Sequence, residues 1–223
     1  MKKLITAALC LAFASVLTFA QGITTASDFF KTISDRYSEI QDYEADVVVK
    51  IGKSEMTGRI SYKRPEMLRI DFSNPAEQVV LFNGNDLTIY LPGSSAILEQ
   101  SVSGNDSKAA NAATAEGLSL MRRYYTVAYE SGQTAVPLDE GSDEMVVNFL
   151  LQRRSATESF REIKLSVDPS TKLIRRVHAT TAQDEEYVFD IFNYKLNSNI
   201  SDQRFMYDPP SSANNYNNFL LSE

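Results

Sequence analysis

The sequence predicts a mainly β domain with two helices, an α+β fold in which the helices lie on one side of an antiparallel sheet. Much of the 223-residue chain consists of short segments in which apolar and polar residues alternate. Turn residues separate these segments, a pattern typical of strands. One segment ahead of these strands repeats its apolar residues three or four positions apart, and another between them is rich in alanine. Both patterns favour helix.

Residues 1–20 are predicted to be a cleavable export signal. Lys2 and Lys3 precede an uncharged apolar run that is shorter than the roughly 20 residues of a membrane-spanning helix, and small residues precede the expected cleavage site before Gln21. The sole cysteine, Cys10, lies in this segment, so the exported chain would carry no thiol. A lipid anchor on Cys10 is the alternative, but the bulky Leu9 precedes it. We therefore expect residues 21–223 to form one periplasmic domain.

Residues 27–43 are predicted to contain an amphipathic helix that opens this domain. Its apolar residues Phe29, Phe30, Ile33, Tyr37 and Ile40 recur three or four positions apart, and the opposite face is charged. The helix is therefore expected to bury one face against the strands that follow.

Strands are predicted from about Asp42 onward, where the apolar period changes from near four to two. Turns such as Asn83-Gly84-Asn85 separate them. Six strands are expected at residues 43–51, 55–63, 67–73, 78–82, 87–91 and 96–101, and four more at 145–151, 160–167, 173–180 and 187–196. Short connections predict two antiparallel meanders.

A helical insertion near 103–126 is predicted to separate the two meanders. Its first half is polar and rich in alanine, and its second half carries Leu118, Leu120 and Met121 beside the Arg122-Arg123 pair. The tail after Pro209-Pro210 is rich in Asn and Ser, so we expect it to be poorly packed.

The charge balance argues against a nucleic-acid partner. The chain has 22 basic and 29 acidic residues and a formal net charge of −7. Nucleic acid or an anionic membrane surface would be repelled at long range unless a basic patch overrode this average, and no basic cluster beyond residue 20 is longer than a pair in sequence.

The sequence has no arrangement typical of a catalytic or metal site, because its paired carboxylates, such as Asp139-Glu140, lie at expected turns or strand ends. The one histidine, His178, is predicted on a strand beside Arg176 and Thr180, in a solvent-facing position without a nucleophile motif. With one histidine and no cysteine in the exported chain, a zinc or iron site is not expected. The sequence thus predicts no catalytic residues, no metal, no cofactor and no enzyme activity.

The inner face of the first meander is predicted to be bulky and apolar. Its members are Ile60, Tyr62, Leu68, Ile70, Phe72, Val79, Leu81, Leu87 and Ile89. One curved sheet cannot bury all of these side chains against itself, so helices or a ligand must cover its concave side. Two interpretations remain open: a permanent core, or a hydrophobic cavity for acyl chains under a lid. The expected lid residues are Phe29, Phe30, Ile33, Tyr37, Leu118, Leu120 and Met121.

Several motifs, most of them in the first meander, resemble those of a known family in their order along the chain. A glycine-led strand from Gly58 ends in Lys63-Arg64-Pro65, and the next strand, 67–73, alternates apolar residues. Residues 74–78, 83–87 and 90–92 then resemble the family's Pro-x-x-Gln, Asp-Gly-x-x-Leu and Tyr-x-Pro elements, and 204–210 its closing Phe-x-Phe-x-Pro-Pro strand. The family is that of the outer-membrane lipoprotein carriers, LolA.

The resemblance implies an unclosed antiparallel β-barrel, a half-barrel covered by α-helices with a hydrophobic cavity inside. It implies a monomeric periplasmic chaperone for lipoprotein localisation, which takes lipidated proteins from an inner-membrane releasing transporter and passes them to an outer-membrane acceptor. It also implies that Arg64 is a latch that hydrogen-bonds the lid and tunes its opening. The chain departs from the family in having no tryptophan, in Asn83-Gly84 where the family has Asp-Gly, and in its middle insertion.

Two other binding functions fit the same residues. One is a carrier of free lipid or glycolipid, because the apolar lining does not specify the head group. The other is a domain that senses lipoproteins, although such proteins usually carry a second domain.

Overall fold

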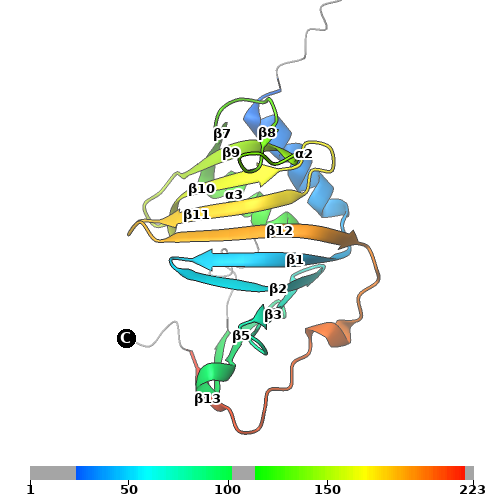
Figure 1. Cartoon of the computed structure of the whole chain (residues 1–223), viewed down its shortest axis with the longest axis vertical. Coiled ribbons are helices and arrows are strands. Elements are labelled where there is room, and N and C mark those ends of the chain that lie inside the picture. The colour runs from blue at the N-terminus through cyan, green and yellow to red at the C-terminus, as the bar shows by residue number, and fades with distance from the viewer. Residues whose placement is uncertain (1–23, 102–113, 219–223) are drawn as a thin grey trace, which may run out of the picture.

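The computed structural model describes residues 24–101 and 114–218, and their strands form one curved, unclosed sheet with two helices on one face (Figure 1). The sheet order is β13-β6-β5-β4-β3-β2-β1-β12-β11-β10-β9-β7, with β8 beside β9. Every pairing is antiparallel except β13 with β6. The predicted class, a mainly β half-barrel with helices, is confirmed. The expected export signal, residues 1–20, lies outside the described residues.

The helices are α2 (Ala26–Glu39) and α3 (Ala115–Tyr124), with short 3₁₀ turns η1 (Pro92–Ser94) and η3 (Asp202–Phe205). The strands of the first half are β1 (Asp42–Ile51), β2 (Ser54–Lys63), β3 (Met67–Asn74), β4 (Val79–Phe82), β5 (Asp86–Leu91) and β6 (Ala96–Ser101). Those of the second half are β7 (Tyr125–Tyr129), β8 (Val136–Pro137), β9 (Met145–Arg153), β10 (Phe160–Val167), β11 (Ile174–Thr181), β12 (Glu186–Leu196) and β13 (Asn214–Asn217).

Helix α2 forms where the sequence predicts it and ends earlier than residue 43. The Thr25 hydroxyl accepts a hydrogen bond from the Asp28 amide at 3.1 Å and caps the first turn. Phe30, Ile33 and Tyr37 are buried. The helix stops at Glu39 because the period-two strand β1 begins at Asp42.

The predicted insertion contains both a helix and a strand. Helix α3 covers residues 115–124, and the chain then passes directly into β7, which pairs with β9. Residues 102–113, the first half of the expected insertion, lie outside the described residues. The prediction that residues 125–126 are helical was wrong, because Tyr125 pairs with Arg153 in the sheet.

The C-terminal tail is better ordered than the sequence predicts. Asn214 to Asn217 form β13 in parallel register with β6, from Asn214 opposite Ala96 to Asn217 opposite Glu99. All four residues are exposed. The expected poor packing therefore holds for their side chains and was wrong for their backbone.

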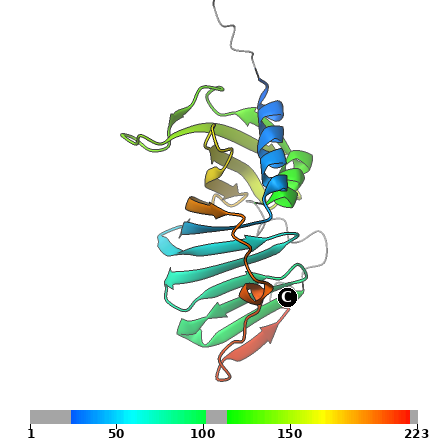
Figure 2. The same cartoon turned by 90° about the vertical axis from the view of Figure 1, so that its right-hand side faces the viewer.

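Two apolar clusters lie on opposite faces of the sheet. The larger one fills the concave side between the helices and the strands, with Phe30, Tyr37, Tyr43, Phe149 and Leu165 at 0% exposure. The smaller one lies on the convex side and consists of Val79, Leu81, Tyr90, Ile97 and Phe205. The first half of the sheet is consequently covered on its convex face by the C-terminal segment, which returns along it toward β13 (Figure 2).

Gly58 shapes the concave wall where β2 meets β3. A Cβ atom at this position would lie 2.4 Å from the Asp71 carbonyl oxygen, so a larger residue would push the strands apart. The pairing shifts register at Thr57/Gly58. The irregularity bends the strand pair and adds curvature to the sheet.

Candidate functional site

The concave face of the first half-sheet carries two apolar rows that run across the strands. Residues opposite one another in neighbouring strands point to the same face, so the register defines each row. The first row is Ile60, Ile70, Val80, Ile89 and Leu98. The second row is Tyr62, Leu68, Phe82 and Leu87.

The two rows differ in exposure. Tyr62, Leu68 and Phe82 are at most 5% exposed, and Leu87 is half-buried. In the first row only Ile60 is buried, whereas the other four side chains are half-buried. The first row therefore presents apolar surface that the described chain does not fully cover.

The predicted position of Val79 and Leu81 on this face was wrong. Val79 lies opposite Asp71 and Leu81 opposite Arg69, on the convex side. Both pack there against Phe205 of the C-terminal segment. The other predicted lining residues, Ile60, Tyr62, Leu68, Ile70, Phe72, Leu87 and Ile89, do share the concave face.

The residues that replace them, Val80 and Phe82, were missed because β4 is apolar at all four positions. A strand covered on both sides has no alternation from which its faces can be read. The signal that resolves the faces lies in β3, where Arg69 and Asp71 mark the convex side opposite Leu81 and Val79.

The C-terminal segment is fixed to the convex side by a polar network. The Arg204 guanidinium donates to the Ser61 hydroxyl at 3.1 Å and pairs with Asp71, and Asp71 also pairs with Arg69. Arg69 in turn donates to the Arg204 and Met206 carbonyls at 3.1 and 3.0 Å. These bonds hold Phe205 over β4 and leave the concave face as the open side.

The two helices lie side by side over the other half of the sheet, and strands β2–β6 extend past their ends (Figure 2). Of the residues expected in a lid, Phe30, Ile33, Tyr37, Leu118 and Met121 are buried in the core, and Phe29 and Leu120 are half-buried. In the described structure the helices thus form a packed layer over β7 and β9–β12.

Tyr37 anchors α2 through a closed ring of hydrogen bonds. Its hydroxyl accepts from the Ile174 amide at 3.1 Å and lies 3.3 Å from the Tyr194 hydroxyl, which donates to the Ile174 carbonyl at 2.9 Å. Burial raises the pKa of Tyr37 to about 12 and that of Tyr194 well above its ordinary value. Both hydroxyls are therefore protonated donors at neutral pH.

Arg64 contacts the same C-terminal end of this helix, at Ser38, which follows Tyr37 in the chain. Its guanidinium Nη1 donates to the Ser38 carbonyl at 2.7 Å, in the last turn of α2, and its amide donates to the Gln41 carbonyl at 2.9 Å. The side chain of Arg64 is exposed. The residue named from the motif is thus in contact with a predicted lid helix, and its use as a latch stays a prediction.

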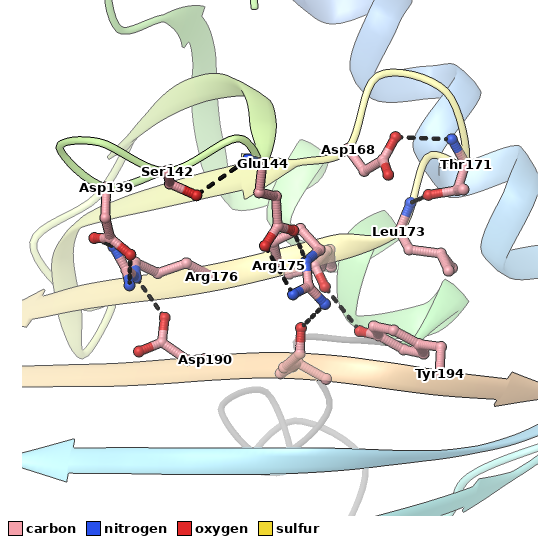
Figure 3. A network of polar contacts seen from close by, with 12 residues as sticks. Asp139, Ser142, Glu144, Asp168, Thr171, Leu173, Arg175, Arg176, Asp190 and Tyr194 are labelled. Carbon is pink, nitrogen blue, oxygen red and sulfur yellow. Dashed lines mark hydrogen bonds and ion pairs between the residues drawn. The ribbon is translucent and has the colours of Figure 1, made fainter. Parts of the chain in front are cut away.

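The outer face of the second half-sheet carries structural ion pairs (Figure 3). Arg175 pairs with Glu144, while Arg176 bridges Asp190 and Asp139. Arg176 holds the pKa of Asp139 below its usual range. The loop that carries Asp139 and Glu144 is thereby fastened to β11 and β12.

His178 lies on this outer face, with its Nε2 atom 3.6 Å from Glu186 Oε1. Among residues 24–101 and 114–218, no group of three or more His, Cys, Asp or Glu side chains could hold a metal ion.

Two shallow grooves lie away from the concave rows. One, of about 460 Å³, is lined by charged residues at the β1–β12 irregularity, including Glu44, Asp46, Arg59 and Lys195. The other, of about 470 Å³, lies between the helices and β7. Neither is lined by the residues predicted to form the hydrophobic cavity. Over the described part of the chain, no helix has the length and hydropathy needed to cross a membrane.

An unclosed sheet with an apolar concave wall and a helical layer defines a lipid- or lipoprotein-binding carrier fold. The family model described as outer membrane lipoprotein carrier protein LolA matches residues 48–208, so the chain belongs to the LolA family. No curated protein sequence matches the chain.

Solved structures share the fold at low sequence identity. An uncharacterised conserved protein from Thermus thermophilus superimposes with a TM-score of 0.55 and 13% identity, over 84% of this chain and 98% of that one. MucB superimposes with a TM-score of 0.51 and 14% identity, over 82% of this chain and 62% of MucB.

Proposed function

We propose that this chain is a periplasmic carrier that binds the acyl chains of lipoproteins on its concave face and moves them from the inner to the outer membrane. The observation that carries the proposal is the half-buried row Ile70, Val80, Ile89 and Leu98. Its strands, β3–β6, extend past the ends of the two helices (Figure 2). Covering such surface with acyl chains is favourable by about 25 cal/mol per Å² of apolar area.

The other parts of the proposal follow from this role. Residues 1–20 would be removed on export, and residues 21–223 would act as one non-catalytic domain. The partners would be lipidated proteins, an inner-membrane transporter that releases them and an outer-membrane acceptor. Membership of a carrier family supports binding rather than catalysis.

The position of Arg64 supports a role in cargo exchange. Its bond to the Ser38 carbonyl joins the β2–β3 turn to α2, and it is exposed to water. An exposed charge-assisted bond contributes only about 1 kcal/mol, so cargo contacts can replace it.

A matched pair of substitutions tests the binding face. Val80→Glu places a carboxylate in the half-buried concave row, whereas Val188→Glu places the same group on the outer face of β12, between Lys50 and His178 in the neighbouring strands. We expect Val80→Glu to abolish binding of a fluorescent fatty-acid probe and Val188→Glu to retain it, with both variants folded by circular dichroism. Equal binding by the two variants would contradict the assignment of the face.

The cargo is identified by native mass spectrometry of the protein purified from the periplasm of its source. Lipidated proteins bound one to one support the lipoprotein carrier. Free lipids or glycolipids alone would instead assign the carrier of free lipid.

A further inference from the structure

The groove between the helices and β7 concentrates positive charge in an acidic chain. It has a volume of about 470 Å³, and its lining residues are Ser27, Ser119, Arg122, Arg123, Thr126, Val127 and Arg154. We call it the arginine groove. Three of its seven lining residues are arginines and none is acidic, whereas the chain as a whole has a net charge of −7. The groove is therefore a local reversal of the average charge.

The three arginines come from two separate elements. Arg122 and Arg123 end α3, where cations are favoured by the helix dipole, and this preference alone accounts for a pair. Arg154 follows β9, and its Nε donates to the Tyr125 carbonyl at 3.1 Å, which holds it beside them. Folding thus places the positive charge of Arg154 beside the Arg122-Arg123 pair, although like charges repel one another.

The guanidinium groups are not neutralised within the described chain. Arg175, Arg176 and Arg204 all form ion pairs, but none of the described carboxylates lies within ion-pair distance of Arg122, Arg123 or Arg154. All three arginines are exposed. The chain has 29 acidic residues, yet none of those described pairs with these arginines. The groove is therefore open to an external anion.

The groove also offers neutral hydrogen-bond donors. The Thr126 hydroxyl already donates to the Gln152 carbonyl at 3.2 Å, so the hydroxyls of the lining residues Ser27 and Ser119 are the further donors. Planar guanidinium forks and hydroxyls together match the geometry of phosphate oxygens, which accept two parallel bonds from one arginine.

We propose that the arginine groove binds the phosphate head groups of anionic phospholipids and docks the protein on a bilayer surface. The proposal rests on the proposed carrier function, because a carrier must meet both membranes to load and release cargo. Exposure of all three arginines favours a bilayer over a small soluble anion, which would bind in a more enclosed pocket. The net negative charge elsewhere is screened beyond about 8 Å at physiological ionic strength, so the local patch can act at contact.

Vesicle flotation tests this docking with the full chain. The wild-type protein is mixed with vesicles of phosphatidylcholine alone or of phosphatidylcholine with phosphatidylglycerol, at low and high NaCl. The test variant is Arg122→Gln/Arg123→Gln/Arg154→Gln. The matched control is Lys50→Gln/Lys53→Gln/Lys195→Gln, which removes the same net charge from β1, the β1–β2 turn and β12.

We expect the wild type and the control to float with phosphatidylglycerol vesicles, and salt to weaken that binding. Each basic residue near an anionic surface contributes about a five-fold gain in affinity, so the triple arginine variant should lose on the order of a hundred-fold. Arg122→Lys/Arg123→Lys should retain most of the binding. The arginine variant should still bind the fatty-acid probe in solution, which separates failure of docking from failure of the carrier function.

Three results would overturn the proposal. The first is wild-type protein that ignores phosphatidylglycerol, and the second is an arginine variant that floats like the wild type. The third is saturable binding of inorganic phosphate to the groove without vesicle binding, which would assign a soluble anion as its ligand.

Discussion

Replacing Tyr37 by Phe tests whether α2 is a fixed part of the fold. The Tyr37 side chain is 0% exposed, and its hydroxyl is the acceptor for the amide of Ile174, itself 0% exposed. The substitution leaves this amide without its acceptor and deprives the Tyr194 hydroxyl of one neighbour. An unsatisfied buried donor costs about 1–3 kcal/mol, so we expect a loss of about 2 kcal/mol in the free energy of unfolding.

Urea denaturation measures this loss against Tyr129→Phe. The Tyr129 hydroxyl donates to the Thr24 carbonyl at 2.9 Å in an exposed bond, so water can replace it and the loss should stay below about 0.5 kcal/mol. Both variants should keep the wild-type dependence of unfolding free energy on urea, because the surface exposed on unfolding is unchanged. If Tyr37→Phe were no more destabilising than Tyr129→Phe, the hydroxyl ring would not anchor the helix.

Two further predictions concern pH and cargo release. Burial raises the pKa of Tyr37 from 10.0 to about 12, so the folded state keeps this proton to a higher pH than the unfolded state. The stability that this contributes is fully present below about pH 10 and falls by roughly 3 kcal/mol toward pH 12. Urea midpoints measured at alkaline pH should fall less steeply in Tyr37→Phe, and identical slopes would contradict this origin. Arg64→Leu should lower stability by only about 1 kcal/mol and prolong cargo retention about five-fold in a reconstituted transfer assay, while Lys53→Leu should behave as wild type. Unchanged transfer by Arg64→Leu would remove the latch role.

The sequence predicted elements best where burial is one-sided. Strand β1 has one buried face and alternates clearly, so its start near Asp42 could be read directly. Strand β4 is apolar throughout because Phe205 covers its convex side, and its faces could not be assigned from the local pattern. Polar β13 was missed because its contribution is backbone pairing with β6, which leaves no apolar signal.

The candidate site likewise has features that the sequence predicted and features that it did not. Sequence motifs were enough to predict the lining residues of β2 and β3, which pair with one another in the sheet. They also singled out Arg64, which contacts α2. The arginine groove was not predicted, because Arg154 is distant in sequence from Arg122 and Arg123 and joins them through the pairing of β7 with β9. A charge cluster built by strand pairing leaves no run in the sequence.

The two contacts of α2 differ in how readily they can be exchanged. The Tyr37 ring is buried, so moving the helix away would leave polar groups of Ile174 and Tyr194 unpaired in an apolar core. The Arg64 bond is exposed, so water can take its place at little cost. Access to the buried second row, Tyr62, Leu68 and Phe82, should therefore come from displacement of the β2–β3 turn, which carries Arg64, while α2 stays in place. In that case Arg64→Leu changes cargo retention without changing hydrogen exchange at the Ile174 amide, and Tyr37→Phe changes exchange at that amide first.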